Sequence, residues 1–346
     1  MGGTFSVSMP SKGKSMFRLA ILITFVLPSL ATAQERDPWI GRRVFWKTNA
    51  IAKVGMETVE ITKISFPTTV GDVNGDWLWL GRGWVQKKDV MDTQQALEFY
   101  TEKIRLNPTS AYDWRSRAAV WHEKGEIENA IKDSTEAIRL DPKFRIAYIT
   151  RGLAHSDKGD FDVAIKDYTE AIRLDPKNVT AYINRGNSLS NKGDLDASIK
   201  DLTEAIRLDP QNAIAYHNRG NALSVKGNFD TAVKDYTEAI RLDPKYSSPF
   251  NGLAWLYATY PDDKYRDGKK AVELATKACA LSAWKDHYDV DTLAAAYAES
   301  GDWTNAVKYQ EKVIEMVTTD KGKVESQERL ALYKRKQPYR EEVQKK

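Results

Sequence analysis

Apolar, small and charged side chains recur along this chain with a period of 34 residues. Glycine keeps the period at Gly125, Gly159, Gly193 and Gly227. Proline keeps it at Pro108, Pro142, Pro176, Pro210 and Pro244. A period of this length is typical of a stack of similar supersecondary units. The pattern therefore predicts a repeat array over roughly residues 92–320.

Each unit has the pattern of two helices joined by a tight turn. When places are counted from Ala111, a small residue stands at place 8 in Ala118, Gly152, Gly186, Gly220 and Ala254. A small side chain there lets two helices approach closely. The glycine at place 15 suits a left-handed helix end, and apolar residues then recur at helical spacing until an Asp-Pro pair. We expect a helical hairpin whose apolar face is covered by the next unit.

The segment AYINRGNSLSNKGDLDASIKDLTEAIRLDP, Ala181 to Pro210, resembles the tetratricopeptide repeat family. The resemblance implies a mainly α fold, an α-solenoid of helical hairpins in a right-handed superhelix. The expected units are 111–144, 145–178, 179–212, 213–246, a degenerate unit 247–286 with an insertion after Pro261, and 287–320. A half-repeat at 92–110 and a helix with a tail at 321–346 are expected to cap the two ends.

Arginine and aspartate occupy two fixed places in the same four units. The pairs are Arg117 with Asp133, Arg151 with Asp167, Arg185 with Asp201, and Arg219 with Asp235. The corresponding pairs in the last two units are Leu253 with Leu274 and Leu293 with Tyr309. Because charge occurs at both places or at neither, we expect a partly buried ion pair between the paired helices. The alternative is that both residues are exposed on their helices.

The segment 34–91 has a different pattern, with short alternating apolar runs separated by turn signals. Its final part, from Gly81 to Val90, resembles the end of a bacterial Src-homology-3-like barrel, which implies a small all-β barrel before the repeats. Trp46, Trp77, Trp79 and Trp84 are either core residues of that barrel or a binding surface.

The turn Asn74-Gly75 predicts a tight hairpin within this segment. Asp72, Asn74 and Asp76 also resemble the start of a calcium loop. However, Trp77 replaces the glycine that such a loop requires, so the hairpin is the better interpretation.

The first 33 residues have the pattern of a secretory signal peptide, typical of a bacterial secreted protein. Basic residues precede the apolar run Leu19–Leu30, and Ala31-Thr-Ala33 supplies the small residues of a cleavage site. The run is short for a membrane span, although an uncleaved anchor is the alternative. We expect export to the periplasm or the extracellular space.

Charge and motifs argue against several classes of function. Removing Lys12, Lys14 and Arg18 with the signal lowers the formal net charge from +4 to +1, which gives no electrostatic case for nucleic-acid binding. The sequence has no phosphate-binding GxxxxGK[ST], no GxSxG and no HExxH motif. Cys279 is the single cysteine, and the four histidines lack ligand spacing. We therefore predict no cofactor, no metal and no catalysis; an enzyme using unrecognised carboxylates in the barrel is the runner-up.

The resemblance places a binding groove on the first helices, at places 2, 5, 6, 9, 12 and 13. These places include Tyr112, Ile149, Ile183, Asn184, Asn187, His217, Asn218 and Asn221. The predicted partner-binding residues are Asn184, Asn187, Asn218 and Asn221 beside Ile183 and His217. Asparagine both donates and accepts, so this wall suits an extended peptide backbone. Ile146, Thr180 and Ile214 stand at a place where relatives that clamp a carboxylate carry basic residues.

Three functions fit this sequence. The first is a non-enzymatic scaffold that binds a peptide or protein partner in the groove. The second is a cell-envelope or cell-wall-binding accessory protein that acts through the barrel, and the third is a homo-oligomeric structural protein. No stable membrane span is expected after signal cleavage.

Overall fold

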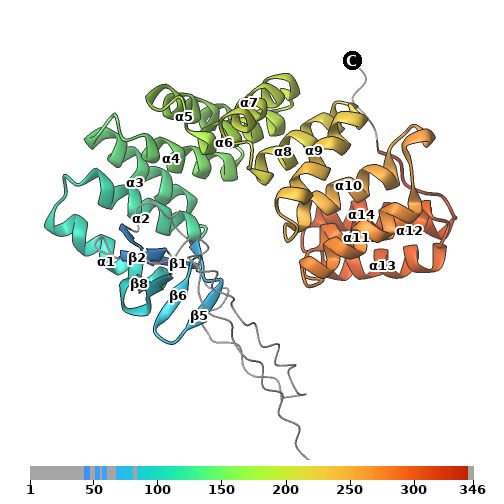
Figure 1. Ribbon diagram of the computed structural model, residues 1–346, viewed down its shortest axis with the longest axis horizontal. Coiled ribbons are helices and arrows are strands. Elements are labelled where there is room, and N and C mark those ends of the chain that lie inside the picture. The colour runs from blue at the N-terminus through green and yellow to red at the C-terminus, as the bar shows by residue number, and fades with distance from the viewer. Residues whose placement is uncertain (1–42, 47–50, 55–56, 61–67, 81–83, 342–346) are drawn as a thin grey trace, which may run out of the picture.

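The computed structural model describes residues 43–46, 51–54, 57–60, 68–80 and 84–341. Fourteen α-helices follow a small β module within these residues and form a curved array (Figure 1). The predicted signal peptide, residues 1–33, lies outside the described residues. The mainly α repeat architecture is confirmed.

Six helical hairpins make up the array, and each predicted unit from 111 to 320 holds one. The first helices are α2 (Ala111–Glu123), α4 (Arg145–Lys158), α6 (Val179–Lys192), α8 (Ala213–Val225), α10 (Ser247–Thr259) and α12 (His287–Glu299). The second helices are α3 (Ile127–Leu140), α5 (Phe161–Leu174), α7 (Leu195–Leu208), α9 (Phe229–Leu242), α11 (Gly268–Leu281) and α13 (Trp303–Met316). A 3₁₀ turn, η3 (Asp263–Tyr265), occupies the predicted insertion.

Glycine and a size match shape each hairpin. Gly159 follows α4 with φ of 86°, the left-handed conformation that the sequence predicts. A Cβ on Gly152 would lie 2.7 Å from the Tyr168 ring, and one on Gly186 would lie 2.9 Å from Leu202. The residue sixteen positions later is thus large where place 8 is glycine. This complementarity fixes how closely the two helices of a hairpin pack.

The predicted arginine–aspartate pairs are confirmed in all four units. In the third, Arg185 Nε and Nη2 donate to Asp201 at 2.6 and 2.8 Å, and their side chains are 19% and 9% exposed. Arg185 Nη1 also donates to Thr169 Oγ1 of the preceding unit at 3.1 Å. Equivalent bonds recur at Arg117, Arg151 and Arg219. Each arginine therefore ties its own hairpin to the one before it.

The β module consists of two antiparallel sheets. One has the order β4 (Thr68–Thr69), β1 (Arg43–Trp46), β8 (Val90–Met91). The other has the order β3 (Glu57–Glu60), β2 (Ile51–Val54), β7 (Trp84–Gln86), β6 (Trp77–Trp79), β5 (Asp72–Asn74). The predicted hairpin is confirmed, since Asn74 pairs with Trp77 across Gly75-Asp76. A Src-homology-3-like barrel stays a prediction, and the side chains of Trp46, Trp79 and Trp84 lie outside the described residues.

The module packs against the first helix of the array, α1 (Thr93–Leu106), which forms the predicted half-repeat. Phe45 and Met91 from the strands share a buried cluster with Ala96 and Tyr100 of α1 and Val120 of α2. The module and half-repeat together cover the apolar face that the first full unit would otherwise expose.

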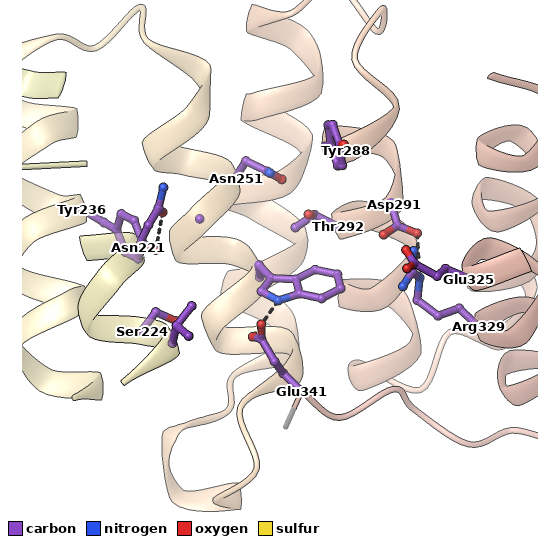
Figure 2. A pocket seen from close by; sticks show the side chains of 13 residues that line it. Asn221, Ser224, Tyr236, Asn251, Tyr288, Asp291, Thr292, Glu325, Arg329 and Glu341 are labelled. Atoms are coloured by element: carbon purple, nitrogen blue, oxygen red, sulfur yellow. Dashed lines mark hydrogen bonds and ion pairs between the residues drawn. The ribbon is translucent and has the colours of Figure 1, made fainter. Parts of the chain in front are cut away.

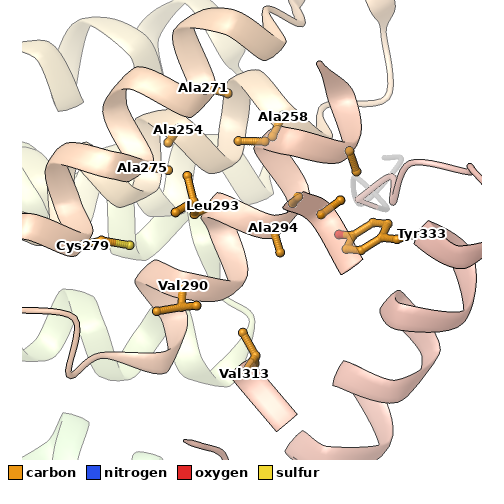
Figure 3. Packing of buried hydrophobic residues seen from close by; sticks show 14 of the residues in the cluster. Ala254, Ala258, Ala271, Ala275, Cys279, Val290, Leu293, Ala294, Val313 and Tyr333 are labelled. Atoms are coloured by element: carbon orange, nitrogen blue, oxygen red, sulfur yellow. The ribbon is translucent and has the colours of Figure 1, made fainter. Parts of the chain in front are cut away.

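The largest buried cluster lies in the last two units and in α14 (Asp320–Lys334), the predicted cap (Figure 3). Leu293 at its centre is 1% exposed, and alanines such as Ala254, Ala271 and Ala294 let the helices pack closely. Tyr333 of α14 is fully buried against this cluster. Leu253 and Leu274 pack together in the neighbouring cluster, where other units have the ion pair.

The described helices were also compared with the length and hydropathy of a membrane span. None of them is long and apolar enough to cross a bilayer.

Candidate functional site

A cavity of about 380 Å³ lies between first helices α8, α10 and α12, with α14 and the C-terminal segment closing it (Figure 2). Helix α8 supplies Asn221, Ser224 and Val225, α9 supplies Tyr236, α10 supplies Asn251, Gly252 and Trp255, α12 supplies Tyr288, Asp291 and Thr292, and Glu325, Arg329 and Glu341 follow. On the first helices these are places 2, 5, 6, 9, 12 and 13, the positions that the family resemblance assigns to a groove.

The α8 wall contains an internal chain of hydrogen bonds. The Tyr236 hydroxyl donates to Asn221 Oδ1 at 2.8 Å, and Asn221 Nδ2 lies 3.2 Å from His217 Nε2. His217 is 9% exposed and packs edge-on against Tyr246. Burial lowers the pKa of His217 to about 4, so the ring is neutral at pH 7 and accepts from Asn221.

The α10 wall is covered by residues near the C-terminus. Trp255 Nε1 donates to Glu341 Oε2 at 2.8 Å, and the Glu341 backbone N–H donates to Thr259 O at 3.0 Å. The Tyr339 ring lies 5.7 Å from that of Trp255, and Arg340 forms an ion pair with Glu299 at 2.6 Å. The segment 339–341, predicted to be part of a polar tail, is therefore docked on the first helices as an added strand of chain.

A buried carboxylate links α12 to the cap. Asp291 Oδ1 accepts from Gln310 Nε2 at 2.8 Å and from Arg329 Nε at 3.1 Å. Arg329 also lies over the Tyr339 ring at 5.6 Å. Burial raises the pKa of Asp291 against the lowering effect of Arg329. Since Arg329 has these two partners already, it contributes little free positive charge to the cavity.

The predicted partner-binding residues lie beside this cavity, on α6 and α8. Asn184 and Asn187 are half-buried on α6, as is Asn218 on α8, and these amides make no side-chain hydrogen bond within the residues that the structure describes. Ile183 is 8% exposed. Of the six predicted residues, Asn221 is the one that lines the cavity, where its amide already has two partners.

Sequence reasoning stopped one unit too early along the array. The same places in the last two units are Asn251, Gly252, Trp255, Tyr288 and Asp291. Applying the place numbers past the insertion would have found them. The contribution of Glu341 had no such signal, because it comes from a segment outside the repeat.

Chemistry requiring a metal cluster or a reactive thiol has no support in the described residues. There, no group of three or more histidine, cysteine, aspartate or glutamate side chains could hold a metal ion. Cys279 is buried, and burial raises the pKa of its thiol to about 12, which disfavours the thiolate.

Two stretches of the chain match the tetratricopeptide repeat family, residues 149–213 and residues 213–246. The chain therefore contains tetratricopeptide repeats, and the predicted resemblance is confirmed for this part. Proteins built from such repeats are generally non-enzymatic scaffolds that bind other proteins or peptides.

Among solved structures, the array is similar to a chain in the crystal structure of the APC/C hetero-tetramer Cut9-Hcn1, with a TM-score of 0.61 and 17% identity. The similarity covers 70% of this chain and 46% of that chain, and at this identity it shows the fold alone. YrrB, described as a TPR protein with an unusual peptide-binding site, is 23% identical with a TM-score of 0.45, covering 59% of this chain and all of that one. MamA is 25% identical with a TM-score of 0.42, covering 44% of this chain and 90% of that one. The last two likenesses are too distant for a conclusion about this chain.

Proposed function

We propose that this protein is a non-enzymatic scaffold that holds an extended segment of a protein or peptide partner along its first helices. The observation that carries the proposal is the position of the cavity. It is lined by three successive first helices, at the repeat places that relatives of this architecture use as a groove.

The adjoining wall supports the same function. Asn184 and Asn218 stand 34 residues apart at equivalent places on α6 and α8. Their half-buried amides are available to a partner, and each can both donate to and accept from a peptide backbone. A strand of chain also docks on α10 through residues 339–341, an example of the binding mode that we propose.

Selection from a random peptide library on the purified protein tests the proposal, with affinities measured by calorimetry. Replacing Asn184 and Asn218 together by alanine should weaken selected peptides by about 1–3 kcal/mol through lost backbone hydrogen bonds. Asn129→Ala, at an exposed position on second helix α3, is the control and should change nothing. Peptides that bind both variants as tightly as the wild type would place the binding surface elsewhere.

We also propose that the chain is exported, on the signal-like pattern of residues 1–33. Mass spectrometry of the native protein tests this, since a chain beginning near Gln34 is expected. For the β module we favour the role of an N-terminal cover, because Phe45 and Met91 are buried against α1 and α2. A Src-homology-3-like barrel that binds the cell envelope is the alternative.

A further inference from the structure

We propose that the cavity between α8, α10, α12 and α14 receives a basic side chain, arginine or lysine, of the partner segment. This occupant specifies the chemistry of the partner and rests on the proposed function. It follows from the charges, the acceptors and the aromatic rings that line the cavity.

Negative charge exceeds positive charge around the cavity. Asp291, Glu325 and Glu341 line it, and Arg329 is the one cation among its described lining residues. Since Arg329 is paired with Asp291 at 3.1 Å, the charges of Glu325 and Glu341 remain unbalanced. Lys321 lies 3.8 Å from Glu325, but both side chains are exposed and such a pair is weak.

Hydrogen-bond acceptors in the cavity await a donor. Asn251 Oδ1 is buried and has no hydrogen-bond partner, although Asn251 lies on the cavity wall (Figure 2). Glu341 uses Oε2 to accept from Trp255. A guanidinium or ammonium group has several donors and no acceptor, so it matches this lining.

Aromatic side chains complete the lining. Trp255 and Tyr288 lie on either side of Thr292 in Figure 2, and Tyr288 is 65% exposed. A cation held near such rings gains a favourable interaction with their faces. The protein uses this chemistry elsewhere, with Arg185 over Tyr182 at 5.7 Å. An acidic segment or a C-terminal carboxylate would meet two unbalanced carboxylates and is disfavoured.

The experiment titrates N-acetyl-arginine amide into the full chain labelled with 5-fluorotryptophan. The ¹⁹F resonance of Trp255 reports on the cavity and is assigned with Trp255→Phe. We expect a saturable shift with half-saturation at about 1–10 mM, the range for a fragment of this size. N-acetyl-citrulline amide, the neutral isostere, should give no saturable shift at the same concentrations.

Charge variants separate a specific site from general screening. Glu325→Gln should raise the half-saturation concentration at least threefold without affecting folding, because Glu325 is exposed. Glu328→Gln, an exposed change on the same helix away from the cavity, is the matched control and should leave it unchanged. Equal shifts with citrulline, or an unchanged titration in Glu325→Gln combined with Glu341→Gln, would overturn the proposal.

The peptide selection distinguishes this failure from a failure of the scaffold function. Selected peptides rich in arginine or lysine that lose affinity in Glu325→Gln support both proposals. Selected peptides that need Asn184 and Asn218 but lack basic residues keep the scaffold function and overturn the basic occupant. If no peptide depends on those asparagines, the proposed function fails even where the arginine probe saturates.

Discussion

Arg185 and Asp201 provide the sharpest test of how the array is held together. Arg185→Ala removes two hydrogen bonds to Asp201, at 2.6 and 2.8 Å, and one to Thr169 at 3.1 Å. It leaves the Asp201 carboxylate, 9% exposed, without its cation. Orphaning one partner of a buried pair costs about 3–5 kcal/mol. Because the Arg185 side chain is 19% exposed, we expect a loss near the lower end, about 3 kcal/mol.

Replacing both residues by leucine should recover most of that loss. The fifth unit has Leu253 and Leu274 in this role, packed in one apolar cluster. Exchange of a buried ion pair for packed apolar side chains is often neutral or stabilising. We therefore expect the double variant to lie within about 1 kcal/mol of wild type.

Amide hydrogen exchange in α6 and α7 is the appropriate assay, because repeat arrays open locally and a single unfolding free energy can mislead. Arg207→Ala on the same hairpin is the control. Arg207 pairs with Glu204 on an exposed face, and its loss should leave the exchange rates unchanged.

Two results would refute this reasoning. One is an Arg185→Ala variant that opens no faster than Arg207→Ala. The other is a double leucine variant as unstable as the sum of its single changes, which would show no energetic coupling between the two positions.

Three further outcomes are expected. Gly152→Ala should cost about 1–3 kcal/mol in urea unfolding, because its Cβ would lie 2.7 Å from the buried Tyr168 ring, and adding Tyr168→Ser should relieve this. Burial holds the pKa of His217 at about 4, below its unfolded value, so its contribution to stability is present above pH 6.5 and falls by about 3 kcal/mol toward pH 4; His217→Phe should flatten that pH dependence of unfolding. Trp255→Phe deletes the donor to Glu341 and should speed proteolysis of the C-terminal segment, while equal rates would show that this bond does not hold the segment.

Much of the fold could be predicted because a repeat states the same local physics several times. The left-handed glycine at Gly159 and the pairing of Arg185 with Asp201 each recur at one spacing, so chance agreement is excluded. The hairpin at Asn74-Gly75 is also a local matter of backbone conformation. The candidate site was only partly accessible, since its positions followed from the repeat but its best-formed cavity lies in the last two units.

The sequence by itself determined the helical hairpins, their boundaries and the ion pair that joins each arginine to its aspartate. These features depend on residues within one unit or its neighbour, whose spacing the chain displays directly. Tertiary structure alone decided that Glu341 meets Trp255, 86 residues away, and that Arg329 of the cap pairs with Asp291. Such contacts join the repeats to a segment with no period. They form because the last unit leaves an open face that only the remaining chain can cover.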